Sequence, residues 1–316
     1  TEVDAWVLIA PDDTVTIRIV RSEMGQGTLT GLAQMVADEL DADWSKVTTE
    51  QPTPGQNVAR DRVWGSFSTG GSQGIRASQQ YVREGGATAR ALLIEAAANE
   101  WGVPASECTA SESVITHKPS GRKTTYGKVA AKAAALPPPM DVKLKDPKDW
   151  KLIGAPVKRI DTTHDKITGK QIFGADVQLD GMLNAAVKAC PVNGGKLVSY
   201  DQSKVSNMPG VRAVVKVDDT AVAVVAETWW QAKTALDALP ITWDKGEHAK
   251  ASSSEYEAII DAGLTADEAF VGNEAGDAEK ALAGASKTVE AVYGYPFQNH
   301  APMEPMNATA VWTEDK

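Results

Sequence analysis

Over the first hundred residues, the pattern of apolar and polar positions changes from one typical of strands to one typical of helices. The runs 4–10 and 14–20 are rich in β-branched residues and are separated by a short turn, which predicts a β-hairpin. Apolar residues then recur at intervals of three and four over 29–40, so we expect an amphipathic helix there. A second helix is predicted over 77–101. Its later half is apolar on nearly every side, and we therefore expect it to be deeply buried.

The pattern changes after three consecutive prolines at 137–139. Such a run favours a stiff, extended chain, which continues to about Trp150. Beyond it, strand patterns alternate with short helical patterns, so the chain as a whole is expected to have an α+β fold. The expected organisation is a domain over 1–136, a linker over 137–154, an α/β unit over 155–245, and the incomplete start of a further domain over 246–316.

Short runs of valine and alanine predict several strands beyond the linker. Trp229 and Trp230 open a helical pattern at a spacing typical of core residues, so we expect both to pack inside. Segment 246–286 is polar and contains two weak helical patterns. The predicted strands are 182–189, 211–217, 221–226, 240–243, 287–295 and 306–312, and the predicted helices are 201–207 and 227–239.

The composition excludes several classes of protein. The chain has 316 residues, a net charge of −10 and a mean hydropathy of −0.27, which is typical of a globular protein. This acidic balance argues against nucleic-acid binding, because no basic surface is available to neutralise phosphates. No apolar run reaches the roughly 18 residues of a membrane span. Two cysteines are too few for a disulfide framework or for the four thiolates of an iron–sulfur cluster.

Residues that commonly hold metals are scattered. The four histidines lie far apart, without the spacing of a metal motif. An acidic run ends the first predicted helix, and we interpret it as a solvated face and not as a metal site. No catalytic residue and no metal ligand is therefore assigned within this chain. The acidic run consists of Asp38, Glu39, Asp41 and Asp43.

Two further positions have ordinary structural interpretations. His300 and Glu304 lie four residues apart between two predicted strands. They could face a cleft, although a buried, hydrogen-bonded turn is the simpler interpretation. Cys190 ends a predicted strand, and we expect an inert packed thiol because no base lies beside it in the sequence.

A glycine-containing turn lies between the hairpin and the first helix. Gly25 and Gly27 allow a tight turn and the close approach of a ligand, and Gln26 adds an amide that both donates and accepts. The N-terminus of the following helix is expected to present unpaired N–H groups suited to a phosphate. The alternative is a glycine turn that caps the helix and binds nothing.

A second polar segment precedes the second helix. It ends a predicted loop over 52–74, which is longer than compact domains usually contain without a functional reason. Residues 69–80 combine glycines, hydroxyls, amides and Arg76, a composition suited to a polar, anionic ligand. The alternative is a solvent-exposed loop with an N-cap. Neither segment has the spacing of a dinucleotide-binding fingerprint or of a P-loop.

Long stretches of this chain resemble the molybdenum-binding subunit of the xanthine oxidase family. They include SEMGQGTLTGLAQMVADELDADWSKV, GGSQGIRASQQYVREGG and FQNHAPMEPMNATA, in the same order and over nearly the whole chain. The most similar branch contains isoquinoline 1-oxidoreductase beta subunits and bacterial aldehyde dehydrogenases. The resemblance implies molybdopterin-binding segments that flank an α/β hammerhead domain at 155–245.

The resemblance also implies an activity, cofactors and partners. Members of this family are molybdenum hydroxylases, which insert a water-derived oxygen at an electron-poor carbon of an aldehyde or an N-heteroaromatic ring. The implied cofactor is molybdopterin cytosine dinucleotide. The implied partners are a small subunit with two 2Fe–2S clusters and, in this branch, c-type cytochromes. Relatives are typically exported by a twin-arginine signal, which implies a periplasmic location.

The cofactor contacts that the resemblance implies fall on the two glycine-rich segments. In the family, a Phe-containing glycine loop and the glutamate that serves as general base follow the His-Ala-Pro-Met-Glu-Pro segment. The base is therefore expected either in a remaining C-terminal part of the subunit or in a second chain that shares its role, and this chain alone is expected to be inactive. In the second segment, Gln73-Gly74-Ile75 departs from the family's pattern. The implied contacts are Gly25, Gln26 and Gly27, followed by Gly71, Ser72, Arg76, Ala77, Ser78 and Gln79.

Two other functions remain open. The chain could be a non-catalytic binding or assembly module that keeps the same fold. A dehydrogenase with pyrroloquinoline quinone is a further alternative, since related proteins carry that label. The sequence shows no repeat of propeller blades that would support it.

Overall fold

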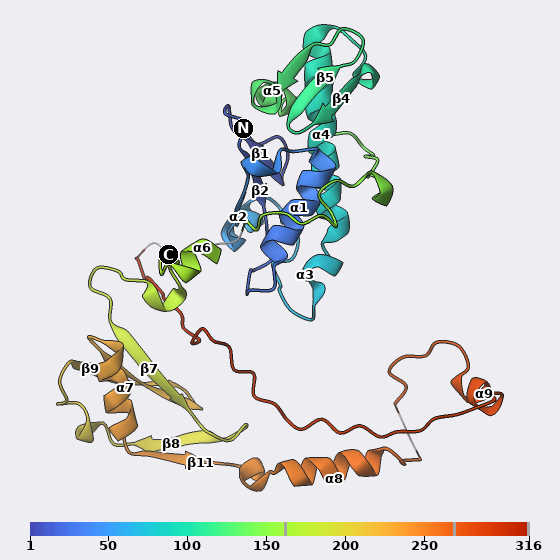
Figure 1. Cartoon of the computed structure of the whole chain (residues 1–316). Helices are drawn as coiled ribbons and strands as arrows, with labels where there is room; N and C mark the ends of the chain where they lie inside the picture. Colours follow the sequence, from blue (N-terminus) through green and yellow to red (C-terminus); the bar gives the residue numbers. More distant parts are fainter. Residues whose placement is uncertain (161–162, 268–269, 315–316) are drawn as a thin grey trace. The chain divides into compact units, whose positions relative to one another are not determined.

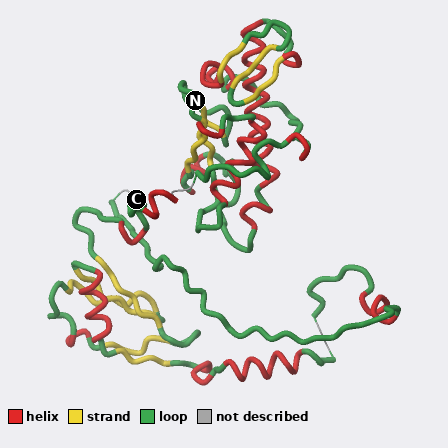
Figure 2. Tube along the Cα trace, viewed as in Figure 1, coloured by secondary structure: helices red, strands yellow, loops and turns green. Residues whose placement is uncertain are grey.

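The computed structural model describes residues 1–160, 163–267 and 270–314 (Figures 1 and 2). The chain forms two compact units, Thr1–Gln171 and Ile172–Lys316. The predicted linker over 137–154 belongs to the first unit, because its later half is hydrogen-bonded to the first long helix of that unit. Within the described residues, no helix is long and apolar enough to cross a membrane.

The first unit is built on a small mixed sheet and two helices. β1 (Val7–Ile9) and β2 (Val15–Arg18) form the predicted antiparallel hairpin, and β3 (Val47–Glu50) pairs parallel to β2. The two predicted helices are confirmed as α1 (Thr28–Leu40) and α4 (Gln79–Trp101). They lie side by side (Figure 1) and bury their apolar faces in one core with the sheet.

The close approach of α1 and α4 depends on glycine. A Cβ at Gly86 in α4 would overlap the carbonyl oxygen of Val36 in α1. A Cβ at the preceding Gly85 would lie 2.6 Å from the Trp6 ring. Ten of the 23 residues of α4 are buried, whereas Glu95, Asn99 and Glu100 in its later half are exposed, so the expected deep burial is confirmed only for one side of the helix. Small residues on that side let the neighbouring backbone come near.

The remaining elements of the first unit are short. After α4, the chain forms a three-stranded antiparallel sheet with α5 beside it. The segment over 52–74, predicted as a plain loop, contains α2 and the start of α3. A capping box between Thr53 and Gln56 begins α2. The bounds are β4 (Cys108–Ser111), β5 (Val114–His117), β6 (Lys123–Thr125), α2 (Pro54–Ala59), α3 (Gln73–Arg76), α5 (Tyr126–Ala133) and α6 (Thr163–Ile167).

The second unit contains two small antiparallel sheets and one packed helix. One sheet has the order β7-β10-β9 and the other pairs β11 with β8. Helix α7 covers the first sheet through Ala232, Ala235 and Leu236. Strand β8 was missing from the sequence prediction. The bounds are β7 (Asn184–Ala189), β8 (Lys196–Tyr200), β9 (Val211–Asp218), β10 (Ala221–Ala226), α7 (Trp229–Ala238), β11 (Ile241–Asp244), α8 (Ser253–Gly263) and α9 (Ala278–Ala283).

Several expectations for the second unit are wrong. Trp229 and Trp230 begin α7 and are 54% and 71% exposed, so they do not pack inside. Segments 287–295 and 306–312 form no strands in the described structure. Their alternating patterns are typical of strands, but a strand also needs a hydrogen-bonding neighbour. The segment from His300 to Glu304 is exposed and is not the buried turn that we expected.

Candidate functional site

The fold brings the two glycine-rich segments together. The Ser22 N–H, just before the first turn, donates to Thr69 Oγ1 in the second segment at 2.9 Å. Gly74 in α3 lies against the start of α1, where a Cβ would be 3.1 Å from Thr28 Oγ1. The two segments are separate in sequence but adjacent in the structure, at one end of α1.

The first turn has the backbone that its glycines favour. Gly25 and Gly27 have φ angles of 94° and 83°, in the left-handed region that other residues rarely adopt. Gly27 is the N-cap of α1 and offers no side chain to the helix. The structural role proposed as an alternative, a glycine cap at the helix start, is therefore present whether or not the turn binds a ligand.

A carboxylate that the sequence analysis overlooked binds the N–H groups of this turn. Glu23 Oε1 accepts from the Gly25 and Gly27 N–H groups at 2.7 and 3.0 Å, and Oε2 accepts from the Leu29 N–H at 2.9 Å. Unpaired N–H groups were expected here, and at these three positions that expectation is wrong. The Gln26 side chain also folds back, and its Nε2 donates to the Ser22 carbonyl oxygen at 2.9 Å.

The second segment leaves most of its polar groups exposed. Gly71 and Ser72 are consecutive left-handed residues, with φ of 57° and 54°, before α3 begins. Arg76 ends α3, Ala77 is its C-cap and Gln79 opens α4. All five of these residues are exposed to solvent.

Ser78 differs from its neighbours because it is fully buried. Its Oγ accepts from Arg21 Nε at 3.0 Å and from the Tyr81 hydroxyl at 2.6 Å. Arg21 also donates to the Ser68 carbonyl oxygen. The buried Arg21 thus connects the end of the hairpin with the second segment, and Ser78 holds its guanidinium in place.

The exposed groups of the two segments suit a polar, anionic ligand. A Cβ built at Gly25 or Gly70 would meet nothing within 4 Å, so the backbone is open to close approach. Ser72, Gln79 and Arg76 supply hydroxyl, amide and guanidinium donors. This donor set is chemically compatible with a polar, anionic cofactor such as molybdopterin.

A cavity of about 640 Å³ lies next to the second segment. Asp4 lies in its wall, and its Oδ1 accepts from the Trp6 and Val7 N–H groups at 2.8 and 2.9 Å. Its Oδ2 is buried and has no hydrogen-bond partner. Burial therefore raises the pKa of Asp4 to about 6. The cavity is lined by Asp4, Ala5, Trp6, Arg21, Arg62, Val63, Trp64, Gly65, Ser66, Tyr81, Glu84, Gly85 and Thr88.

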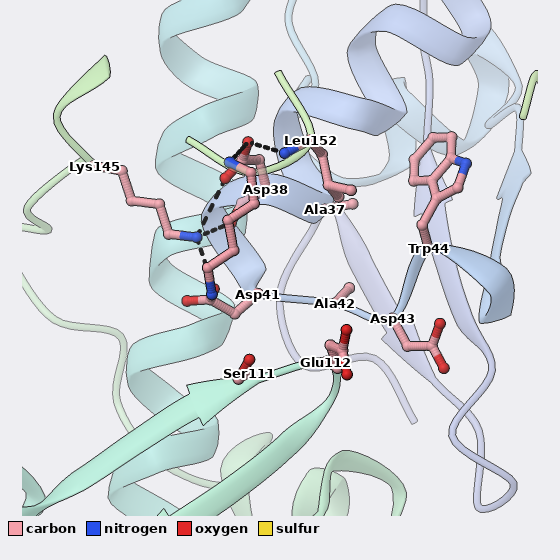
Figure 3. Close-up of a pocket in the computed structure, with 11 residues that line it drawn as sticks. Ala37, Asp38, Asp41, Ala42, Asp43, Trp44, Ser111, Glu112, Lys145 and Leu152 are labelled. Carbon is pink, nitrogen blue, oxygen red and sulfur yellow. Dashed lines mark hydrogen bonds and ion pairs between the residues drawn. The ribbon is translucent and has the colours of Figure 1, made fainter. Parts of the chain in front are cut away.

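The acidic end of α1 borders a smaller pocket of about 350 Å³ (Figure 3). We expected a solvated acidic face here, and that expectation is wrong for Asp38, which is 1% exposed. Asp38 Oδ2 accepts three consecutive N–H groups, from Lys151, Leu152 and Ile153, at 3.0, 2.8 and 2.8 Å. Lys145 Nζ lies 3.2 Å from Asp38 Oδ1.

Glu39 is also fully buried and pairs with a cation. Its Oε1 lies 2.7 Å from Arg83 NH2 and accepts from Arg83 Nε at 2.9 Å. The backbone N–H of Lys145 donates to the same carboxylate. Asp38 and Asp41, both drawn in Figure 3, likewise bind Lys145 and Lys151, so these acidic residues hold the segment 145–153 against α1. Among the described residues, no group of three or more acidic, histidine or cysteine side chains is placed to hold a metal ion.

Comparisons with known proteins identify the family. The sequence profile of the molybdopterin cofactor-binding domain matches residues 1–193. This chain belongs to that family, and its resemblance to molybdenum-binding subunits of the xanthine oxidase family is confirmed. Both glycine-rich segments and their supporting helices lie inside the matched region.

Named relatives are oxidoreductases that are longer than this chain. The "Membrane-bound aldehyde dehydrogenase (pyrroloquinoline-quinone)" of Gluconacetobacter polyoxogenes is 31% identical over 96% of this chain and 40% of its own length. The "Isoquinoline 1-oxidoreductase subunit beta" of Brevundimonas diminuta is 30% identical over 76% of this chain and 35% of its own. Quinoline 2-oxidoreductase from Pseudomonas putida 86, a solved structure, matches 26% of this chain at 19% identity, with a TM-score of 0.23.

Proposed function

We propose that this chain is the cofactor-binding portion of a molybdenum hydroxylase that oxidises an aldehyde or an N-heteroaromatic compound. The observation that carries the proposal is the convergence of two glycine-rich, donor-rich segments at one end of α1. Both segments lie within the region that matches the molybdopterin-binding family. The two relatives reported above carry names for oxidation of an aldehyde and of an N-heteroaromatic ring.

The chain's own residues would bind and orient the cofactor. Gly25 and Gly70 leave room beside the backbone, and Arg76 and Gln79 supply donors for phosphate and base. Ser78 acts indirectly, because it is buried and holds Arg21. When bound, the molybdenum centre supplies the two-electron redox chemistry that the side chains lack. We assign no catalytic base within this chain.

The cofactor form, the partners and the location are parts of the same proposal. The cofactor is molybdopterin cytosine dinucleotide, held jointly with the remaining C-terminal part of the subunit. Electrons pass to a small subunit with 2Fe–2S clusters and onward to a c-type cytochrome. The complex works in the periplasm, and residues 155–245 form a hammerhead domain with a structural role.

The experiment that tests the proposal measures the cofactor directly. The full-length protein is purified from its native host with all co-purifying chains, and its metals are quantified by elemental mass spectrometry. Acid hydrolysis then identifies the released nucleotide. We expect about one molybdenum and one cytidine monophosphate per complex. A complex without molybdenum, from a host with intact cofactor synthesis, would contradict the proposal and favour a non-catalytic assembly module.

A further inference from the structure

The geometry points to Glu23 as a positioning residue that fixes the Gly25–Gly27 turn in the conformation that contacts the cofactor. The inference rests on the proposed function, since it assumes that this turn meets the cofactor. It assigns a role to a side chain that does not itself need to touch the cofactor.

Glu23 binds the turn at several points at once. One carboxylate accepts three backbone N–H groups, from Gly25, Gly27 and Leu29, at 2.7 to 3.0 Å. These donors span the whole turn and reach the first turn of α1. Hydrogen bonds to an ionised group are stronger than those between neutral groups, so a single side chain ties the turn to the helix.

Without this carboxylate, the turn would be flexible. Gly25 and Gly27 both have positive φ, and glycine loses more conformational freedom on ordering than any other residue. Gly27 offers no side-chain cap to α1, and the first turn of α1 contains no acidic residue. Glu23, placed before the helix, therefore provides the favourable interaction of an anion with the helix N-terminus.

The same turn carries Gln26, which the family resemblance places at the cofactor. Its side chain bonds to Ser22 and Met24 within the same turn. The position of Gln26 therefore depends on the turn that Glu23 closes. If the turn opens, the fraction of molecules ready to bind falls, and the apparent affinity falls in proportion.

The test uses three variants of the full-length protein in its complex. Glu23→Ala removes all three acceptor interactions, whereas Glu23→Gln keeps an amide oxygen that can accept from Gly25 and Gly27. Glu95→Ala is the matched control, because Glu95 is an exposed glutamate on α4 and its loss changes the charge equally. Molybdenum per complex is measured for each variant. Hydrogen exchange of the peptide over 22–31 and the melting temperature are measured on protein from a host that cannot make molybdopterin.

We expect Glu23→Ala to exchange faster over 22–31 and to contain about five- to tenfold less molybdenum, with a melting temperature near that of the wild type. Glu23→Gln should recover most of the molybdenum, and Glu95→Ala should behave as wild type. Normal or increased molybdenum in Glu23→Ala, despite faster exchange, would overturn the inference, and an increase would mean that the cofactor displaces Glu23. A wild-type complex without molybdenum would instead reject the proposed function.

Discussion

The two ends of α1 use carboxylates in the same chemical way but for different purposes. At the N-terminal end, Glu23 accepts three N–H groups that lie two to six residues away. At the C-terminal end, Asp38 also accepts three N–H groups, but these come from residues 113 to 115 positions later. Glu23 is only half-buried, whereas Asp38 is 1% exposed. One end organises a local turn, and the other fastens a distant segment.

Burial determines how much stability the protein loses when one of these carboxylates is removed. Water can replace Glu23 as the acceptor for an exposed turn, so its loss should cost little stability and should mainly affect the shape of the turn. The carboxylates of Asp38 and Glu39 are 1% and 0% exposed, so the loss of either removes the acceptor that its donors face inside the protein. The predictions that follow are ordered by the size of their expected effect on the free energy of unfolding.

Glu39→Ala should be the most damaging substitution at either end of α1. It leaves Arg83, whose side chain is 14% exposed, without the buried carboxylate that it faces at 2.7 Å. Removal of one partner from a buried ion pair typically costs about 3–5 kcal/mol. Urea denaturation followed by circular dichroism measures the change. Glu95→Ala on α4 is the control, and a loss for Glu39→Ala no greater than the control's would show that the pair contributes nothing.

Asp4 offers a carboxylate with only one oxygen satisfied, and it should make stability depend on pH. Its folded-state pKa of about 6 exceeds its ordinary value of 3.8, so the folded state binds the proton more tightly. This contribution to stability is present below about pH 3.8 and is lost as the pH rises to about 6, up to about 3 kcal/mol.

The substitution Asp4→Asn removes this titration while keeping an oxygen that can accept from Trp6 and Val7. As the pH rises from 4 to 7, we expect the wild type to lose unfolding free energy relative to the variant. Urea midpoints at several pH values measure the shift. A difference that stays constant over this range would mean that Asp4 does not titrate abnormally.

Asp38→Asn should have an intermediate effect. The amide oxygen can still accept from the backbone of Lys151, Leu152 and Ile153, but the NH2 group meets the ammonium group of Lys145 instead of pairing with it. We expect a loss of about 2 kcal/mol and faster hydrogen exchange over 143–155. If exchange in that segment is unchanged, Asp38 is not what holds it to α1.

Glu23→Ala should have the smallest effect on stability. The turn that it closes is largely exposed, so we expect a loss of less than about 1 kcal/mol by urea denaturation. The comparison of the two helix ends predicts that Glu39→Ala costs at least twice as much in the same assay. Equal losses at the two ends would remove the distinction between a local and a long-range role.

The sequence predicted those elements that are specified by the local spacing of their apolar and turn residues. The hairpin, α1, α4 and the two glycine-rich segments all follow from periodicity and turn chemistry. The adjacency of the two segments was not visible, because it depends on contacts such as that between Ser22 and Thr69. The role of Glu23 could have been predicted from the sequence, because an acidic residue that precedes a helix interacts favourably with the helix N-terminus.

The acidic end of α1 shows why the remaining features could not be predicted. Charged residues are rarely buried unless paired, so Asp38 and Glu39 were interpreted as solvent-facing. Their partner Lys145 lies more than a hundred residues later, within a segment that has no regular pattern. The false strands at 287–295 and 306–312 have the same origin, because a strand is defined by a neighbour that local spacing does not reveal.

Gly86, where α4 lies closest to α1, limits which mutations the gene can accept. Every single-base change that replaces a glycine codon with another amino acid codon adds at least a Cβ. At Gly86 that atom would collide with a main-chain carbonyl, which has no rotamer with which to move aside. Related proteins that diverge elsewhere should therefore keep glycine at this position, or have helices that lie further apart.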